Sequence, residues 1–126
     1  MVHGHGGNLE AVQRATAVLN SEQRNIASWW PHIPGADAHA GNTETSLMLA
    51  INPNLVRIDK LDVGNIQPMS EIQHDLQTHG VQAVSANGIL GDARNATTQH
   101  GIELLAELSA NLRTFILSAQ LQWSRA

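Results

Sequence analysis

Two stretches of the chain carry apolar residues at the spacing of an amphipathic helix. In residues 9–21 they fall three or four positions apart, and the polar Gln13 and Arg14 lie off that stripe. Residues 96–123 form the longest periodic segment, with an apolar stripe from Ile102 to Ala119. We therefore predict a helix in each stretch.

Shorter elements lie between these two helices. Residues 47–51 and 69–78 are predicted to be helical, with Gly80 directly after the second. Residues 25–30 and 80–85 are short apolar runs, and we predict a buried strand in each. Short strands that alternate with helices are typical of an α/β fold with a mainly parallel sheet.

The chain opens on a glycine-rich turn, His3-Gly4-His5-Gly6-Gly7-Asn8. We expect this turn to join a strand that ends near Val2 to the first helix, with Asn8 as the N-cap of that helix. His5 would then lie at the C-terminal edge of a sheet, where α/β folds bind ligands. Because only Met1 and Val2 precede the turn, we expect the chain to be the C-terminal part of a larger domain.

Composition narrows the class of protein. A length of 126 residues with 42% hydrophobic residues predicts one domain over residues 1–126. The net charge of −4 and the scattered basic residues argue against nucleic acid. No apolar run is long enough for a membrane span, and without a signal peptide the cytoplasm is the default location. Charged residues make up only 14%, which suggests that part of the surface is covered by a missing segment or partner subunits.

Three clusters carry candidate chemistry. His5 in its glycine turn could reach a metal or a substrate, or only bond its own loop. The same turn at a helix N-terminus could cradle a phosphate, although the Lys-Ser/Thr pair of a P-loop is absent. Asp37, His39 and Glu44 suit a general acid/base or a metal site, although Glu44 could equally be a charge at the helix N-terminus and residues 42–45 could be simple capping. Asn87 and Gly88 lie in a glycine-containing loop whose backbone could approach a ligand, although most such loops are simple turns.

Taken together, these residues resemble the creatininase (creatinine amidohydrolase) family over nearly the whole chain. The likeness rests on three motifs in order, which are Gly4-His5-Gly6-Gly7-Asn8, Asp37-Ala38-His39-Ala40-Gly41-Asn42-Thr43-Glu44-Thr45-Ser46 and Gly88-Ile89-Leu90-Gly91-Asp92. Within the family, residues 80–92 look most like the peptidases of the mycofactocin system, which release a C-terminal dipeptide from a precursor peptide.

The resemblance implies a three-layer α/β/α fold and a hydrolase site with two divalent metal ions (Zn, Fe or Mn). It makes His5 and Glu44 metal ligands and His39 the catalytic acid/base, with Asp37 beside it. Gly6, Gly7, Asn8, Asn87 and Gly88 would line the substrate loops. The implied substrate is a peptide or a small cyclic amide, and the implied assembly is a homo-oligomer, with neither nucleic acid nor membrane as a partner.

Two features depart from the family pattern. Gly7 stands where creatininase has a further glutamate ligand, and His3 stands where an asparagine is usual. The family's first half, with its Glu-x-His motif and a later Asp, is absent. We therefore expect this chain alone to bind metal weakly and to be inactive. The alternative is a non-catalytic truncated paralogue or fragment that needs an N-terminal partner.

Overall fold

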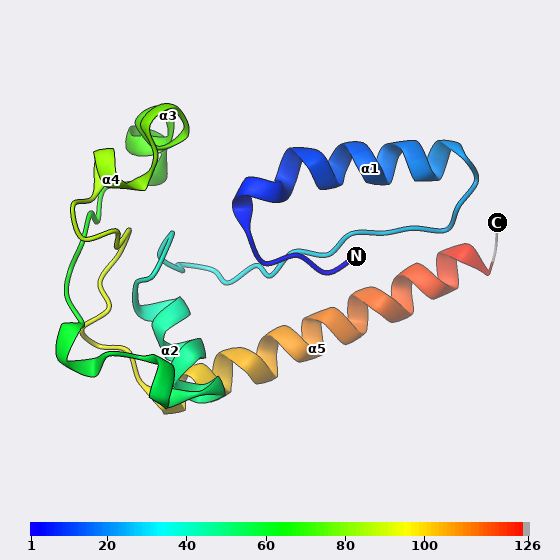
Figure 1. The fold of residues 1–126 in the computed structure, drawn as a ribbon. Coiled ribbons are helices and arrows are strands. Elements are labelled where there is room, and N and C mark those ends of the chain that lie inside the picture. Colours follow the sequence, from blue (N-terminus) through cyan, green and yellow to red (C-terminus); the bar gives the residue numbers. More distant parts are fainter. Residues whose placement is uncertain (125–126) are drawn as a thin grey trace. The chain divides into compact units, whose positions relative to one another are not determined.

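The computed structural model describes residues 1–124, which are mostly helical (Figure 1). The helices are η1 (Gly6–Asn8), α1 (Leu9–Ser21), α2 (Asn42–Ile51), η2 (Pro53–Leu55), η3 (Ile58–Lys60), α3 (Met69–His79), α4 (Val81–Val84) and α5 (Thr98–Trp123). Within this described part, β-pairing is confined to three isolated bridges, one parallel and two antiparallel. The predicted mainly parallel sheet and three layers therefore stay a prediction.

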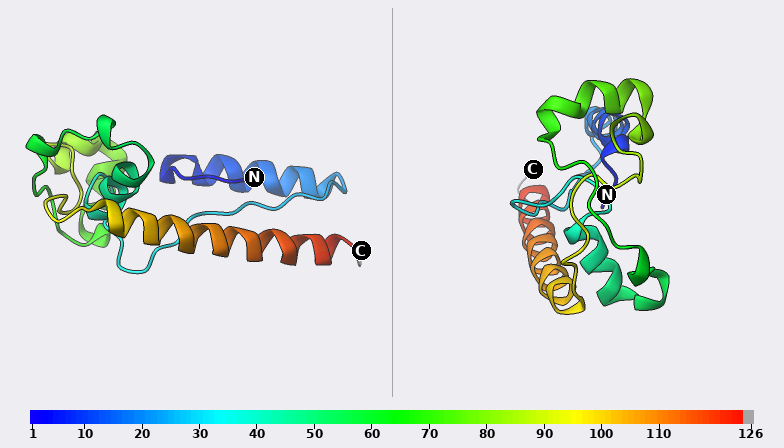
Figure 2. Two further views of the ribbon diagram at one scale, coloured as in Figure 1. Left: turned by 90° about the horizontal axis from the view of Figure 1, so that it is seen from below. Right: turned by 90° about the vertical axis from the view of Figure 1, so that its left-hand side faces the viewer.

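The chain divides into two compact units. Unit 1 comprises Met1–His32 and the chain from Glu107 onward, and unit 2 comprises Ile33–Ala106. Residues of α5, which is seen along its length in Figure 2, belong to both units, with Thr98–Ala106 in unit 2 and the rest in unit 1. That residues 1–126 act as a single domain therefore remains a prediction.

Unit 1 is built from α1, two extended segments and the part of α5 that begins at Glu107. After α1 the chain reverses at Gln23, which adopts a left-handed φ of +60°, and then runs back along α1 (Figures 1 and 2). Val2 and Trp29 form the parallel bridge, in which the His3 amide donates to the Trp29 carbonyl at 3.1 Å. The Trp29 amide donates to the Met1 carbonyl at 2.9 Å. The predicted strands thus meet, although over only one bridge.

Asn8 is the N-cap residue of α1, as predicted, but it is helical and its side chain makes no capping hydrogen bond. Helical structure begins earlier, at η1, and the cap is His5, whose Nδ1 accepts a hydrogen bond from the Gly7 amide at 2.9 Å. The ring nitrogen of His5 thus replaces the serine or asparagine oxygen that usually accepts the capping hydrogen bond.

Unit 2 buries a few apolar residues on α2, α3, the start of α5 and the loop before it. Its buried apolar residues are Leu49, Ile72, Leu90, Ala93 and Leu104. Residues 89–93 pair on both sides through the antiparallel bridges His39–Leu90 and Val63–Asp92. The buried Ser46 hydroxyl accepts a hydrogen bond from the Thr97 amide at 3.1 Å, which fixes the start of α5 against α2.

Two sequence predictions for unit 2 need correction. Residues 80–85 are not a strand, because Val81–Val84 forms the short helix α4, which packs against α3. Gly80, with φ of +81°, ends α3 and allows a new helical turn to follow. Helix α2 begins at Asn42 rather than near residue 47, because a carboxylate upstream caps it.

Candidate functional site

His39 and Glu44 form a close pair in unit 2. His39 Nδ1 lies 3.3 Å from Glu44 Oε2, and both side chains are about half exposed. Glu44 Oε2 also accepts a hydrogen bond from the Ala40 amide at 2.6 Å. At 3.3 Å the imidazole and the Glu44 carboxylate can form an ion pair when the imidazole is protonated, and the half-exposed ring is accessible to a substrate.

The backbone around His39 fixes this geometry. The His39 amide donates to the Leu90 carbonyl at 3.2 Å, and the Leu90 amide donates back to the His39 carbonyl at 2.8 Å. Ala40 then adopts a left-handed φ of +52°, which is uncommon for a residue with a Cβ. This turn carries the chain from the bridge into α2, so that Glu44 in the first helical turn lies beside the imidazole. Strained backbone of this kind clusters at functional sites.

Asp37 caps α2 across the same turn. Its carboxylate accepts hydrogen bonds from the amides of Asn42 and Thr43, the latter at 3.1 Å. Gly41 and Gly91 leave the space that this carboxylate occupies, because a Cβ at either position would overlap the Asp37 side chain. Both oxygens are thus engaged with the helix N-terminus. Asp37 therefore anchors the N-terminus of α2. Its catalytic role remains a prediction.

The glycine turn with the other predicted ligand lies in unit 1. His5 is exposed, and its Nδ1 is already bonded to the Gly7 amide, so that only Nε2 could reach a ligand. Gly7 lies directly against the His5 ring, and Gly6 has open space around it. The Asn8 amide donates to the His5 carbonyl at 3.0 Å, which closes the turn.

The loop of Asn87 and Gly88 is held by side-chain hydrogen bonds. Asn87 Oδ1 accepts from the Ser85 hydroxyl at 2.9 Å and from the Ile89 amide at 3.1 Å, while its Nδ2 donates to the Val63 carbonyl at 3.0 Å. Gly88 turns the chain with φ of +81°. The side-chain amide of Asn87 is therefore hydrogen-bonded within its own loop. A contact between Asn87 and substrate remains a prediction.

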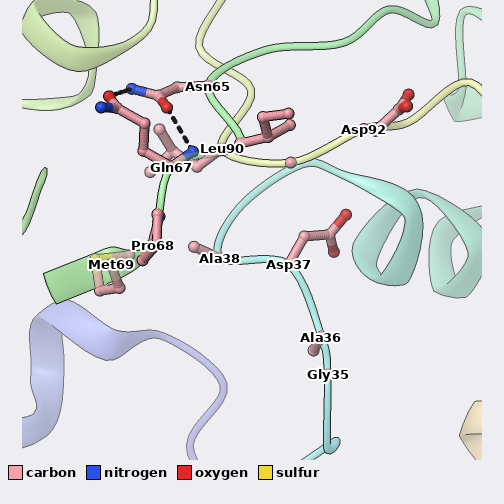
Figure 3. Close-up of a pocket in the computed structure, with 12 residues that line it drawn as sticks. Gly35, Ala36, Asp37, Ala38, Asn65, Gln67, Pro68, Met69, Leu90 and Asp92 are labelled. Carbon is pink, nitrogen blue, oxygen red and sulfur yellow. Dashed lines mark hydrogen bonds between the residues drawn. The ribbon is translucent and has the colours of Figure 1, made fainter. Parts of the chain in front are cut away.

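Two open cavities of unit 2 adjoin Asp37. One of about 360 Å³ lies between residues 35–38, residues 65–69 and residues 90–92 (Figure 3). The other, of about 470 Å³, is also lined by Asn95 and His100. Figure 3 shows the Asp37 carboxylate directed toward a helix and the Asn65 and Gln67 amides bonded to each other. Sequence patterns did not single out Asn65 and Gln67, because isolated amides carry no recognisable spacing.

Asp92 lines both cavities and pairs with Arg94. The guanidinium donates to the two carboxylate oxygens at 2.9 and 2.7 Å. These hydrogen bonds, with a further one from the Arg94 backbone, lower the pKa of Asp92 to about 2. Asp92 therefore stays ionised at neutral pH and is unsuited to act as a general acid.

The described residues do not fit a complete metal centre. No group of three or more His, Asp or Glu side chains in this part of the chain could hold an ion. Glu44 Oε2 already bonds to Ala40, and both Asp37 oxygens are engaged with α2. Nor does any described helix have the length and hydropathy needed to cross a membrane.

Comparison with known proteins shows which family this chain resembles in sequence. A family model described as creatinine amidohydrolase matches residues 1–116. A relative from Mycolicibacterium smegmatis, named mycofactocin precursor peptide peptidase, is 48% identical over 108 residues, which cover 85% of this chain and 43% of the relative. A protein of the same name from Mycobacterium tuberculosis is 42% identical over 108 residues, with the same coverage.

A solved structure shares the fold. It is that of a protein from Bacteroides fragilis assigned as a creatinine amidohydrolase, with a TM-score of 0.68 and 19% identity. The match covers 94% of this chain and 53% of that protein, and this chain likewise spans less than half of the curated relatives it matches. The creatininase-like fold is thereby confirmed, and the chain belongs to the creatininase family.

Proposed function

We propose that this chain supplies the histidine–glutamate part of an amide-hydrolysing site that acts on a peptide. The observation that carries the proposal is the 3.3 Å approach of His39 Nδ1 to Glu44 Oε2, with both side chains about half exposed. A histidine held in this way can pass a proton to the nitrogen that leaves when an amide bond breaks. Glu44 is then a positioning residue, since it acts through the imidazole.

The peptide substrate is inferred from the relatives. The named relatives are peptidases for the mycofactocin precursor peptide, and this chain is 48% identical to one of them over the matched residues. We propose trimming of that precursor as the activity of the complete protein, with a small cyclic amide as the second substrate class. A homo-oligomer in the cytoplasm remains part of the proposal.

The family resemblance implies two divalent metal ions, and the residues described here fall short of holding them. His5 and Glu44 are the ligands that the resemblance implies, and no group of three or more donors forms in the described part of the chain. We therefore derive no catalytic step through a metal, and we expect the isolated chain to be inactive. That expectation also favours the second candidate, a non-catalytic fragment that needs a partner.

A chimera tests the proposal. In it, this chain replaces the matched segment of the Mycolicibacterium relative, and release of peptide product is followed by mass spectrometry. We expect the chimera to cleave the precursor peptide and the isolated chain not to. His39→Gln should lower kcat by about 10²- to 10⁴-fold, the usual contribution of a general acid/base.

Glu44→Gln separates positioning from binding. We expect kcat to fall about tenfold with KM unchanged, because the imidazole loses the charge that orients it. The matched control is Glu71→Gln, which alters a first-turn acid of α3 instead of α2 and should leave kcat unchanged. A folded chimera that cleaves nothing would overturn the enzyme proposal and leave the non-catalytic alternative.

A further inference from the structure

Asn87 and Gly88 form a chemically labile pair in unit 2. Asparagine is one of the thermolabile residues of proteins, because the backbone nitrogen of the following residue can attack its carboxamide carbon. A following glycine has no side chain to hinder that attack. Asn87–Gly88 is the only Asn-Gly pair in the sequence, and Asn87 is exposed to water. The pair is therefore expected to lose its side-chain amide unless the fold prevents the reaction.

The structure holds the carboxamide of Asn87 in place. Its Oδ1 accepts hydrogen bonds from the Ser85 hydroxyl and the Ile89 amide, and its Nδ2 donates to the Val63 carbonyl. Both polar atoms of the side chain are thus engaged, one within the loop and one with a segment more than twenty positions earlier in the chain. The carboxamide cannot turn toward the Gly88 nitrogen unless these hydrogen bonds break.

The attacking atom is engaged as well. The Gly88 amide donates to the Ser85 carbonyl at 3.1 Å, which closes a turn in which Gly88 has φ of +81°. Ser85 is buried, and its hydroxyl also lies 2.7 Å from the Ile89 carbonyl. Because both ends of the turn are fixed, the Gly88 nitrogen can reach Asn87 Cγ only after the loop has opened.

We propose that Asn87 is a latent deamidation site, which the loop of residues 85–89 keeps closed and which reacts when that loop opens. In the reaction a bond forms between Gly88 N and Asn87 Cγ, the bond from Cγ to Nδ2 breaks, and ammonia leaves with the proton of the Gly88 amide. Water then opens the five-membered ring at one of its two carbonyl groups. The product is an aspartate, or an isoaspartate in which the main chain runs through the former side chain. The reaction involves neither an oxidant nor a reductant.

Deamidation weakens the support of His39. An aspartate at position 87 has no Nδ2, so that a carboxylate oxygen faces the Val63 carbonyl, and two acceptors cannot bond to each other. The neighbouring Leu90 pairs with the backbone of His39 through its amide and its carbonyl. Loss of the bond to Val63 therefore loosens the segment to which His39 is paired.

Mass spectrometry follows the reaction, because replacement of the amide by a carboxyl group adds about 1 Da. The folded chimera described above and the same chimera unfolded in guanidinium chloride are incubated at one pH and temperature, and peptide mapping locates the change. We expect Asn87 to react at least about tenfold more slowly in the folded state, because the reaction waits for the loop to open. Equal rates in the two states, or an Asn87 that stays intact even when unfolded, would overturn the proposal.

Ser85→Ala removes the hydroxyl that holds Asn87 Oδ1 and should open the site. Loss of one hydrogen bond raises the open fraction of the loop about fivefold, and we expect Asn87 to react faster by the same factor in the folded variant. The matched control is Ser70→Ala, which removes an exposed hydroxyl from α3 and should change the rate by less than about twofold. Equal rates in the two folded variants would show that this loop does not keep the site closed.

Asn87→Asp has the side chain of the product, and its effect is measured by hydrogen exchange at the Leu90 amide. This amide bonds to the His39 carbonyl at 2.8 Å, and we expect it to exchange about tenfold faster in the variant than in the original chimera. Unchanged exchange would show that Asn87 does not support the segment paired with His39. Since neither mass nor exchange depends on catalysis, an inactive chimera would reject only the proposed activity and leave this inference intact.

Discussion

Gly101 lies where α5 passes close to α2, and Gly101→Ala is a sharp test of the packing in unit 2. A Cβ at this position would fall on the carbonyl group of Ser46 and against the side chain of Ala50. The Ser46 carbonyl is backbone and cannot rotate away, so that the two helices would have to separate. Separation would also loosen the bond from the Thr97 amide to the Ser46 hydroxyl, which is fully buried.

The magnitude follows from two opposed effects. Alanine is favoured over glycine inside a helix by about 1 kcal/mol. Overpacking of a filled interior costs about 1–3 kcal/mol, and contact with backbone places this case at the upper end. The net expectation is a loss of about 2 kcal/mol in the free energy of unfolding, or roughly 4–8 °C in Tm for a chimera as long as the relative.

Urea unfolding of the chimera, followed by far-ultraviolet circular dichroism, measures this loss. Gly4→Ala is the control, because Gly4 has open space around it and no positive φ, and it should change stability by less than about 0.5 kcal/mol. A Gly101→Ala chimera as stable as the original would show that the two helices do not approach as described.

Three further predictions concern unit 2 and can be measured in the same chimera. Asp37→Ala should cost about 1–2 kcal/mol of unfolding free energy through loss of the α2 cap, whereas Asp59→Ala, at an exposed site, should change it by less than about 0.5 kcal/mol. Arg94→Gln should raise the pKa of Asp92 from about 2 toward the ordinary aspartate value of 3.8, as seen by NMR titration of the carboxyl carbon. Because the folded pKa is the depressed one, the stability that this pair adds is present above pH 3.8 and should vanish as the pH falls through about 2. Gly91→Ala should destabilise the fold more than Gly88→Ala, since only at Gly91 would the new Cβ meet the Asp37 side chain.

The bounds of the helices could be predicted where the local sequence carries clear signals. Both bounds of α1, Leu9 and Ser21, match the prediction, and so does the start of α3 at Met69. Each of these helices has clear apolar periodicity and an evident end. The run Val81–Val84 has neither, because two valines three positions apart suit one helical turn as well as a short strand. Contact with α3, which the sequence cannot show, accompanies the helical outcome.

The candidate site, too, could be predicted only in part from the sequence. The proximity of His39 and Glu44 follows from their spacing around a loop that enters a helix, and the structure brings their side chains together. The cap from Asp37 was not foreseen, because capping rules look to the residue just before the helix, and Asp37 reaches Asn42 across five positions. That reach needs the left-handed turn at Ala40, a conformation without a sequence signal when the residue is not glycine.

The fit of Gly91 around Asp37 bears on how genes of this family can be recombined. Gly91 has φ of +151° and no room for a side chain, because the Asp37 carboxylate and Cβ fill that space. A crossover between residues 44 and 88 would join one parent's acidic loop to another parent's glycine loop. Such a hybrid would keep both motifs intact by sequence and still fail to pack if either parent carried a larger residue at its half of the contact. The two loops are therefore best inherited together, as a single exchangeable block.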